Sequence, residues 1–179
     1  MTVETTNIEG ILIINPTVYS DARGYFFESY NKEALRDVLD VSFVQDNESL
    51  SQRGVLRGLH FQNPPYAQGK LVRVIKGAVL DVAVDIRKAS PTYGQSFVKT
   101  LSEENKTTLY IPEGFAHGFL VLEDDTIFSY KCTKYYHQPA EEAILWNDKD
   151  LAIPWDFNQP ILSEKDENAQ KFATFVSKF

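Results

Sequence analysis

The stretch Leu80-Asp-Val-Ala-Val-Asp-Ile86 decides the fold class. Its large apolar side chains occupy every second position and alternate with Asp81, Ala83 and Asp85. This alternation predicts a half-buried β-strand, because successive side chains of a strand point to opposite faces of the sheet. The Lys76-Gly77 dipeptide before it predicts the turn that leads into this strand.

Similar short patterns lie on both sides of this segment. Strands are predicted over residues 54–62, 108–111, 117–122 and 126–130, with glycine and proline between them. Many short strands separated by turn residues indicate an all-β antiparallel sandwich or barrel. A short helix is expected over residues 31–40. Ser163 and the apolar spacing after it predict a C-terminal helix that packs on a sheet.

Length and composition narrow the class of protein. The chain has 179 residues, which fits a single domain spanning 1–179. Its net charge of −7 without a basic cluster argues against nucleic-acid binding. The lone Cys132 excludes an internal disulfide, and no apolar run is long enough to span a membrane. The polar, acidic start lacks a secretory signal, so we expect a cytoplasmic protein with no membrane association.

The chain has three histidines, His60, His117 and His137, and for each the alternative is a structural or surface role. His60 lies in the apolar segment 54–62, and a strand there would hold it rigidly. Arg57 would point to the other face of that strand. A β-bulge at Gly58 would bring both side chains into one pocket. His137 is expected at the surface.

His117 follows a Pro-x-Gly turn in Pro112-Glu-Gly-Phe-Ala-His117. This spacing resembles the second motif of the cupin superfamily, in which the histidine is usually a metal ligand. A metal-binding cupin also has two histidines flanking one residue in its first motif. Here Gln62 replaces the second of them, and no carboxylate follows before Lys70. Two ligands are too few for a stable transition-metal site, so no metal is expected.

Other residues suit acid–base chemistry on an anionic ligand. Arg23, Arg57, Lys70 and Arg73 are interspersed among the predicted strands, and the planar fork of arginine suits a diphosphate. Tyr130 follows Phe128 on one strand face and could equally be core filler with a bonded hydroxyl. Asp166 stands where a carboxylate caps a helix, so its pattern alone does not indicate catalysis.

Together these segments resemble the dTDP-4-dehydrorhamnose 3,5-epimerase family from about residue 13 to residue 166. Gly54-Val-Leu-Arg-Gly-Leu-His-Phe-Gln62 and Ile111-Pro-Glu-Gly-Phe-Ala-His-Gly-Phe119 carry much of the resemblance. The other matching segments are 21–30, 43–47, 68–73, 81–87, 144–148 and 163–166. The resemblance implies a cupin, or jelly-roll, double-stranded β-barrel with a few short peripheral helices.

The resemblance also implies roles for individual residues. His60 corresponds to the general base and Asp166 to its partner. Tyr130 corresponds to the acid on the opposite face of the sugar, and Lys70 to the cation near the 4-keto oxygen. The implied substrate-binding residues are Arg23, Phe26, Glu28, Gln45, Asn47, Arg57, His117, Tyr136, Glu141 and Lys165. Phe26 and Tyr136 would stack on the thymine, and the family forms homodimers with strands exchanged between subunits.

The implied reaction is metal-free and cofactor-free epimerisation of dTDP-4-dehydro-6-deoxy-D-glucose at C3 and C5. Its product, dTDP-4-dehydro-L-rhamnose, is a precursor of rhamnose in polysaccharides such as O-antigen. A histidine base and a tyrosine acid suit this reaction, because the 4-keto group acidifies both C–H bonds. The alternatives are a 3-epimerase, an epimerase of another nucleotide-linked 4-keto sugar, a metal-dependent cupin enzyme and a non-catalytic sugar-binding module.

Overall fold

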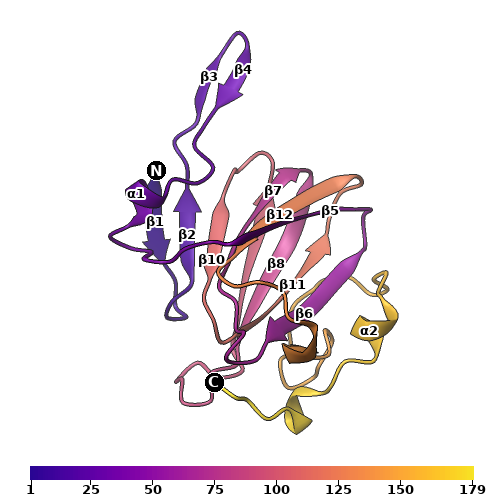
Figure 1. The fold of residues 1–179 in the computed structure, drawn as a ribbon. Coiled ribbons are helices and arrows are strands. Elements are labelled where there is room, and N and C mark those ends of the chain that lie inside the picture. Colours follow the sequence, from indigo (N-terminus) through magenta and orange to yellow (C-terminus); the bar gives the residue numbers. More distant parts are fainter.

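Two antiparallel sheets form the body of the molecule in the computed structural model, which describes residues 1–179 (Figure 1). The six-stranded sheet has the order β1-β2-β10-β7-β12-β5, and the five-stranded sheet has the order β13-β6-β11-β8-β9. Neighbouring strands are often distant in the sequence, which is the crossing connectivity of a jelly roll. The all-β cupin-type barrel predicted from the sequence is therefore confirmed.

The strands of the six-stranded sheet are β1 Thr2–Thr5, β2 Leu12–Asn15, β5 Gln45–Ser51, β7 Lys70–Lys76, β10 Thr108–Ile111 and β12 Thr126–Cys132. Those of the five-stranded sheet are β6 Leu56–Gln62, β8 Ala78–Asp85, β9 Ser96–Ser102, β11 Phe115–Val121 and β13 Glu141–Ala143. The four strands predicted at 54–62, 108–111, 117–122 and 126–130 are thus present, with small shifts at their ends. The turn predicted at Lys76-Gly77 joins β7 to β8, and Gly77 has a φ of 77°.

Aromatic contacts join the two sheets inside the barrel. Phe119 of β11 stacks on Phe128 of β12, with ring centroids 4.1 Å apart. Both side chains are buried within a cluster that includes Val72 and Val79. Burying aromatic side chains of this size contributes about 2 to 3 kcal/mol each. This packing helps to fix how the two sheets face each other, and both rings border a hollow that is otherwise lined mostly by polar residues.

Strand β8 is buried on both faces, and the sequence-based expectation of a half-buried strand is wrong. Asp81, Ala83 and Asp85 are at most 1% exposed. The face of β8 that carries Val82 and Val84 lies under the C-terminal segment, which contributes Trp155, Phe172 and Phe175. The alternation correctly separated the two faces of β8, but both faces are covered by other parts of the protein.

The predicted helix at 31–40 shortens to α1 Lys32–Leu35, one turn capped by the Asn31 side chain. Leu35 and Leu39 are buried against the outer face of the six-stranded sheet, whereas Val38 is half exposed. Aspartate and β-branched residues after Leu35 have weak helix propensity, which explains why the helix does not continue.

The predicted C-terminal helix is also wrong in extent. The only helical elements beyond β12 are α2 Glu164–Glu167 and the 3₁₀ turns Gln138–Ala140 and Phe172–Thr174. Between α2 and the last 3₁₀ turn, the Gln170 carbonyl accepts from the Leu145 N–H at 2.8 Å. The chain at Gln170 is therefore extended and not helical. The segment still packs on the five-stranded sheet, as expected, through Phe172 and Phe175.

A hairpin of β3 Tyr19–Asp21 and β4 Gly24–Phe26 projects from the body, at the top of Figure 1. Tyr19, Tyr25 and Phe26 are each more than half exposed on it. No helix of the molecule combines the length and apolar character needed to cross a membrane.

Candidate active site

A polar cavity opens into the barrel between the two sheets. Two adjoining hollows of about 230 and 300 Å³ share the side chains of Asn47, His60, Lys70 and Tyr130. His60 comes from β6 of the five-stranded sheet, whereas Lys70 and Tyr130 come from β7 and β12 of the six-stranded sheet. The structure therefore brings the predicted base and the predicted acid to one cavity from facing sheets.

The β-bulge expected at Gly58 is present. Between β6 and β11, His117 pairs with His60 while Phe119 pairs with Arg57, so β6 carries one extra residue in this interval. Gly58 has a φ of 129°, a region that side chains rarely allow. The bulge places both Arg57 and His60 on the cavity wall, although a regular strand would point them apart.

His60 is paired with Asp166, 106 residues further along the chain. Its Nε2 lies 2.5 Å from Asp166 Oδ1, and the aspartate is 2% exposed. Burial raises the pKa of the Asp166 carboxyl, but the hydrogen bond and charge of His60 outweigh it and leave that pKa below the ordinary value. Asp166 also donates its N–H to the Ser163 hydroxyl, so the expected cap and the dyad coexist.

The two other groups with predicted catalytic roles have pKa values shifted by burial. Burial raises the pKa of the Tyr130 phenol, and Cys132 adds to this effect. Burial lowers the pKa of the Lys70 ammonium group. Tyr130 therefore holds its proton more firmly than a free tyrosine, and Lys70 loses its proton more readily than a free lysine. The two residues lie on the neighbouring strands β12 and β7, where Lys70 pairs with Cys132, two residues after Tyr130.

His117 is 6% exposed and lies beside the cavity, where its Nε2 approaches Asp81 Oδ2 at 2.9 Å. Asp81 is fully buried, and its Oδ1 has no hydrogen-bond partner. Sequence reasoning missed Asp81, because the contact depends on how β8 and β11 are aligned. A buried carboxylate fixes the tautomer of its histidine partner, so Asp81 orients His117.

The mouth of the cavity is lined by a connected set of polar groups. Glu141 Oε2 accepts from the Tyr136 hydroxyl at 2.8 Å and pairs with Lys165 Nζ at 2.6 Å. Burial raises the pKa of Glu141, but the Lys165 and Tyr136 hydrogen bonds outweigh it, and the net pKa is lowered. Gln45 and Asn47 join this lining from β5. These five predicted binding residues are thus brought together.

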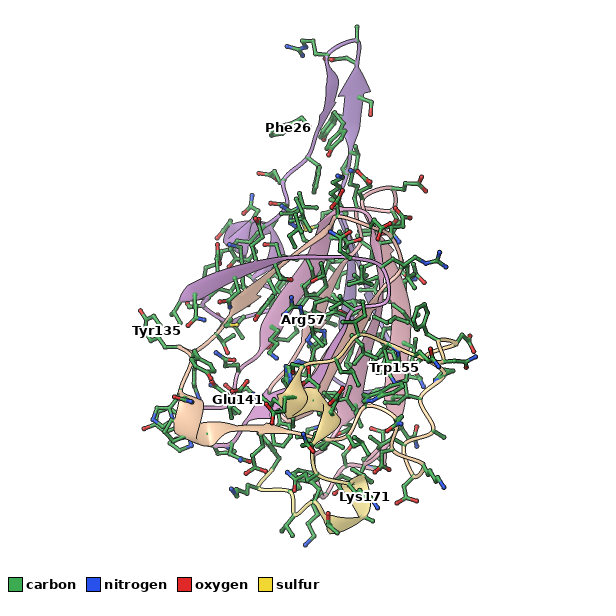
Figure 2. All side chains as sticks on the ribbon, turned by 90° about the vertical axis from the view of Figure 1, so that its right-hand side faces the viewer. Phe26, Arg57, Tyr135, Glu141, Trp155 and Lys171 are labelled. Carbon is green, nitrogen blue, oxygen red and sulfur yellow. The ribbon has the colours of Figure 1, made fainter.

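Three predicted binding residues are not at this cavity. Arg23 and Phe26 lie on the projecting hairpin, and Figure 2 shows Phe26 far from Arg57 and Glu141. Arg23 is paired with Asp21, and Glu28 accepts from Asn31 beside α1. Arg73, whose side chain also seemed suited to an anion, points away from the cavity toward the ring of Phe27.

No three histidine, cysteine, aspartate or glutamate side chains gather in a way that could hold a metal ion. His60 and His117 are each paired with an aspartate. Gln62 lines the cavity, but its amide is bonded to main-chain groups. His137 is partly buried, stacked on Tyr66 with ring centroids 3.6 Å apart, and is less exposed than expected.

Comparison with known proteins places this geometry in a family. The model of the dTDP-4-dehydrorhamnose 3,5-epimerase family matches residues 5–174. The chain belongs to this family. The dTDP-4-dehydrorhamnose 3,5-epimerase of Shigella flexneri is 53% identical over 174 residues, which cover 96% of each chain. The resemblance stated from the sequence is therefore confirmed.

Solved structures of similar epimerases agree with this assignment. The dTDP-6-deoxy-D-glucose-3,5-epimerase of Legionella pneumophila, in complex with dTDP-4-keto-L-rhamnose, has a TM-score of 0.94 and 47% identity, covering 98% of this chain and 94% of that one. A 3'-monoepimerase from Streptomyces bikiniensis, in complex with dTDP-quinovose, has a TM-score of 0.89 and 36% identity, covering 94% and 87%. Double and single epimerases thus share the fold of this family.

Proposed function

We propose that this chain is an isomerase that converts dTDP-4-dehydro-6-deoxy-D-glucose into dTDP-4-dehydro-L-rhamnose by inverting C3 and C5. The observation that carries the proposal is the meeting of His60 and Tyr130 in one cavity from two facing sheets. Inversion needs one group to remove a proton from one side of the ring and another to return a proton on the other side. The activity named for the similar epimerases supports the same conclusion.

In the proposed first half of each step, His60 removes the proton on the carbon next to the 4-keto group. The electron pair of the broken C–H bond moves into the ring, and the keto oxygen becomes an enolate oxygen. Asp166 stabilises the resulting imidazolium through its short contact with Nε2. Lys70 supplies positive charge to the enolate oxygen, and loss of a comparable donor typically slows a reaction about 10² to 10³-fold.

In the second half, Tyr130 gives its phenolic proton to the same carbon from the other face. The electron pair of the enolate forms the new C–H bond and restores the ketone. Imidazolium and tyrosinate then return to their starting states by exchanging protons with solvent. The raised pKa of Tyr130 supports this role, because the phenol keeps its proton at neutral pH until the enolate is present.

The rest of the substrate is assigned to the cavity walls and mouth. Arg57 and His117 suit the diphosphate or the sugar hydroxyls, since both line the inner hollow. Tyr136, Lys165 and Glu141 suit the nucleoside at the mouth, together with Gln45 and Asn47.

We further propose that the protein is a homodimer of one cupin-type domain each, in which Arg23, Phe26 and Glu28 complete the site of the other subunit. A two-stranded hairpin is only marginally stable in water without packing, and β3–β4 exposes three large aromatic side chains. Moving the charges of a nucleotide sugar into lipid is costly, so the enzyme and its substrate must share one compartment, and we assign both to the cytoplasm.

The second candidate is inversion of C3 alone, and the similar 3'-monoepimerase favours considering it. The test of both is NMR of the product formed from dTDP-4-dehydro-6-deoxy-D-glucose in D₂O. We expect deuterium at C3 and C5 and the product dTDP-4-dehydro-L-rhamnose. Label at C3 alone would establish the single epimerase, and binding without any label would reject catalysis.

A further inference from the structure

The segment 133–137 follows the end of β12 and carries Tyr136 to the mouth of the cavity, with Tyr135 beside it in the chain. Most of its main chain has left the sheet: only Thr133 still makes a sheet-like contact, to the Gly69 carbonyl at 3.0 Å. Both tyrosine side chains are more than half exposed, so the stacking of His137 on Tyr66 is the main ring packing that holds this segment. Its position otherwise depends on how its main-chain polar groups are bonded.

Three glutamine side chains supply those bonds, residue by residue. The Lys134 carbonyl accepts from Gln68 Nε2 at 2.7 Å, and the Tyr135 carbonyl accepts from Gln62 Nε2 at 3.3 Å. The next two residues donate their N–H groups to glutamine oxygens, Tyr136 to Gln45 at 2.9 Å and His137 to Gln62 at 2.8 Å. Four consecutive residues are thus held by side-chain amides that all belong to the cavity wall.

Gln62 has the largest share in this arrangement. It is 4% exposed, and its Nε2 also donates to the Tyr66 carbonyl at 2.7 Å. A main-chain carbonyl can only accept and a main-chain N–H can only donate, so the orientation of the amide is fixed by its partners. Gln62 therefore links residues 66, 135 and 137, and its polar atoms point to the main chain.

The held segment ends in groups that face the nucleotide side of the cavity. The Tyr136 hydroxyl donates to Glu141, which also pairs with Lys165. His60, Lys70 and Tyr130 stand instead on strands held by main-chain ladder bonds. Gln62 and Gln45 take part in these ladders through their main chains, so replacing their side chains leaves the ladder bonds in place. A disturbance of the glutamine bonds would consequently move the binding groups at the mouth before it moved the reacting ones.

We propose that Gln62 and Gln68 are positioning residues that set the affinity for the nucleotide by holding the main chain of residues 134–137. The inference rests on the proposed function, in which Tyr136 and its partners bind the nucleoside. Neither glutamine needs to touch the substrate for this role. Gln62 takes the position that a metal ligand occupies in metal-binding cupins, and here it organises the cavity mouth.

The test compares Gln62→Met and Gln68→Met with the wild type and with Gln52→Met. Methionine keeps the length of the side chain and removes the amide, and Gln52 is an exposed glutamine that bonds only to Asp125. Calorimetric titration with dTDP measures binding without turnover, and steady-state assays give kcat and KM. We expect the Kd for dTDP and the KM of the nucleotide sugar to rise about tenfold in Gln68→Met, which loses one hydrogen bond worth about that factor. The rise should be at least as large in Gln62→Met, which loses three such bonds. We expect kcat to change less than about threefold.

Unchanged dTDP affinity in the two cavity variants, or a fall in kcat at unchanged KM, would overturn the proposal. A merely structural role would lower Tm and kcat together and leave the Kd of the folded fraction unchanged, which is also a contrary result. Gln68 is less buried and makes one such bond, so Gln68→Met decides the matter if Gln62→Met does not fold. Because dTDP binding is read separately from turnover, a wild type that binds dTDP but does not epimerise would reject the proposed function alone.

Discussion

His60 and Asp166 form the contact on which the proposed chemistry depends at the scale of single residues. Replacing His60 by Asn removes the base but keeps a polar side chain of similar size. We expect solvent exchange at both C3 and C5 to fall about 10² to 10⁴-fold, because one base serves both carbons. NMR of the sugar in D₂O measures each position separately. Exchange retained at either carbon would contradict the single-base assignment.

Lys70 predicts how the reaction responds to alkaline pH. Burial lowers its pKa, so its positive charge is present at low pH and is lost as pH rises through that lowered pKa. The pKa of Tyr130 is raised, so the phenol is still protonated in that range. We therefore expect kcat to fall on the alkaline side when Lys70 loses its proton.

The matched variants for this prediction are Lys70→Arg and Lys76→Arg. A guanidinium stays charged to a far higher pH, so Lys70→Arg should move the alkaline fall upward by about one pH unit or more, even where kcat itself is reduced. Lys76 is exposed and outside the cavity, and its replacement should leave the profile of kcat against pH in place. An alkaline limb that Lys70→Arg does not move would remove Lys70 from this role.

At the scale of elements, local sequence pattern predicted the strands well and the helices less well. The alternation in β8 is readable because every second residue is large and apolar. Its full burial could not be predicted from this pattern, because the outer face is covered by residues 151–179, which are distant in the sequence. The C-terminal apolar spacing suggested a helix, but the pairing of Leu145 with Gln170 holds that chain extended. In both cases a contact between distant segments overrides the local pattern.

The bulge in β6 makes the strongest prediction about an element. A Cβ at Gly58 would lie 2.5 Å from Gly118 Cα and 2.8 Å from the His117 carbonyl oxygen, both main-chain atoms that cannot move aside. Gly58→Ala should therefore lower the free energy of unfolding by about 3 kcal/mol or more, through overpacking as well as its positive φ.

Gly24→Ala is the control for Gly58→Ala in denaturant unfolding at one protein concentration. Gly24 has a similar φ of 123°, but a Cβ there would meet no atom of its own chain within 4 Å. It should cost only about 1 kcal/mol, the backbone share of the effect. Equal losses in the two variants would show that close approach of β6 and β11 does not limit stability.

For the molecule as a whole, the family resemblance supplied what local pattern could not. Residues 60 and 166 meet although they are far apart in the chain, and no spacing rule brings them together. Asp81 and the glutamines of the cavity mouth were missed for the same reason, because their partners lie on other strands. The bulge at Gly58 is the exception, since a glycine between Arg57 and His60 indicated how both side chains could line one pocket.

The projecting hairpin gives a prediction that only an assembly of two chains can satisfy. Arg23 lies on this hairpin and His60 in the cavity, so an exchanged hairpin would let one subunit supply Arg23 to the His60 of the other. Arg23→Ala alone should raise the KM for the nucleotide sugar at least about tenfold, because charge-assisted hydrogen bonds to the substrate are lost. His60→Asn alone should be inactive. When equal amounts of the two are unfolded and refolded together, half of the dimers should be mixed, and each should hold one intact site.

The mixture should accordingly recover about a quarter of the wild-type sites at substrate concentrations too low for the Arg23→Ala parent to turn over efficiently. The control is a refolded mixture of His60→Asn with Arg53→Ala, in which an exposed arginine outside the hairpin is replaced. Its activity shows what the intact His60 sites contribute when the hairpin arginine is present in both chains. The decisive comparison is the refolded Arg23→Ala and His60→Asn mixture against the same proteins mixed without unfolding. Activity equal to the plain sum of the two parents in both mixtures would mean that each cavity uses its own hairpin or none, and that the site is complete within one chain.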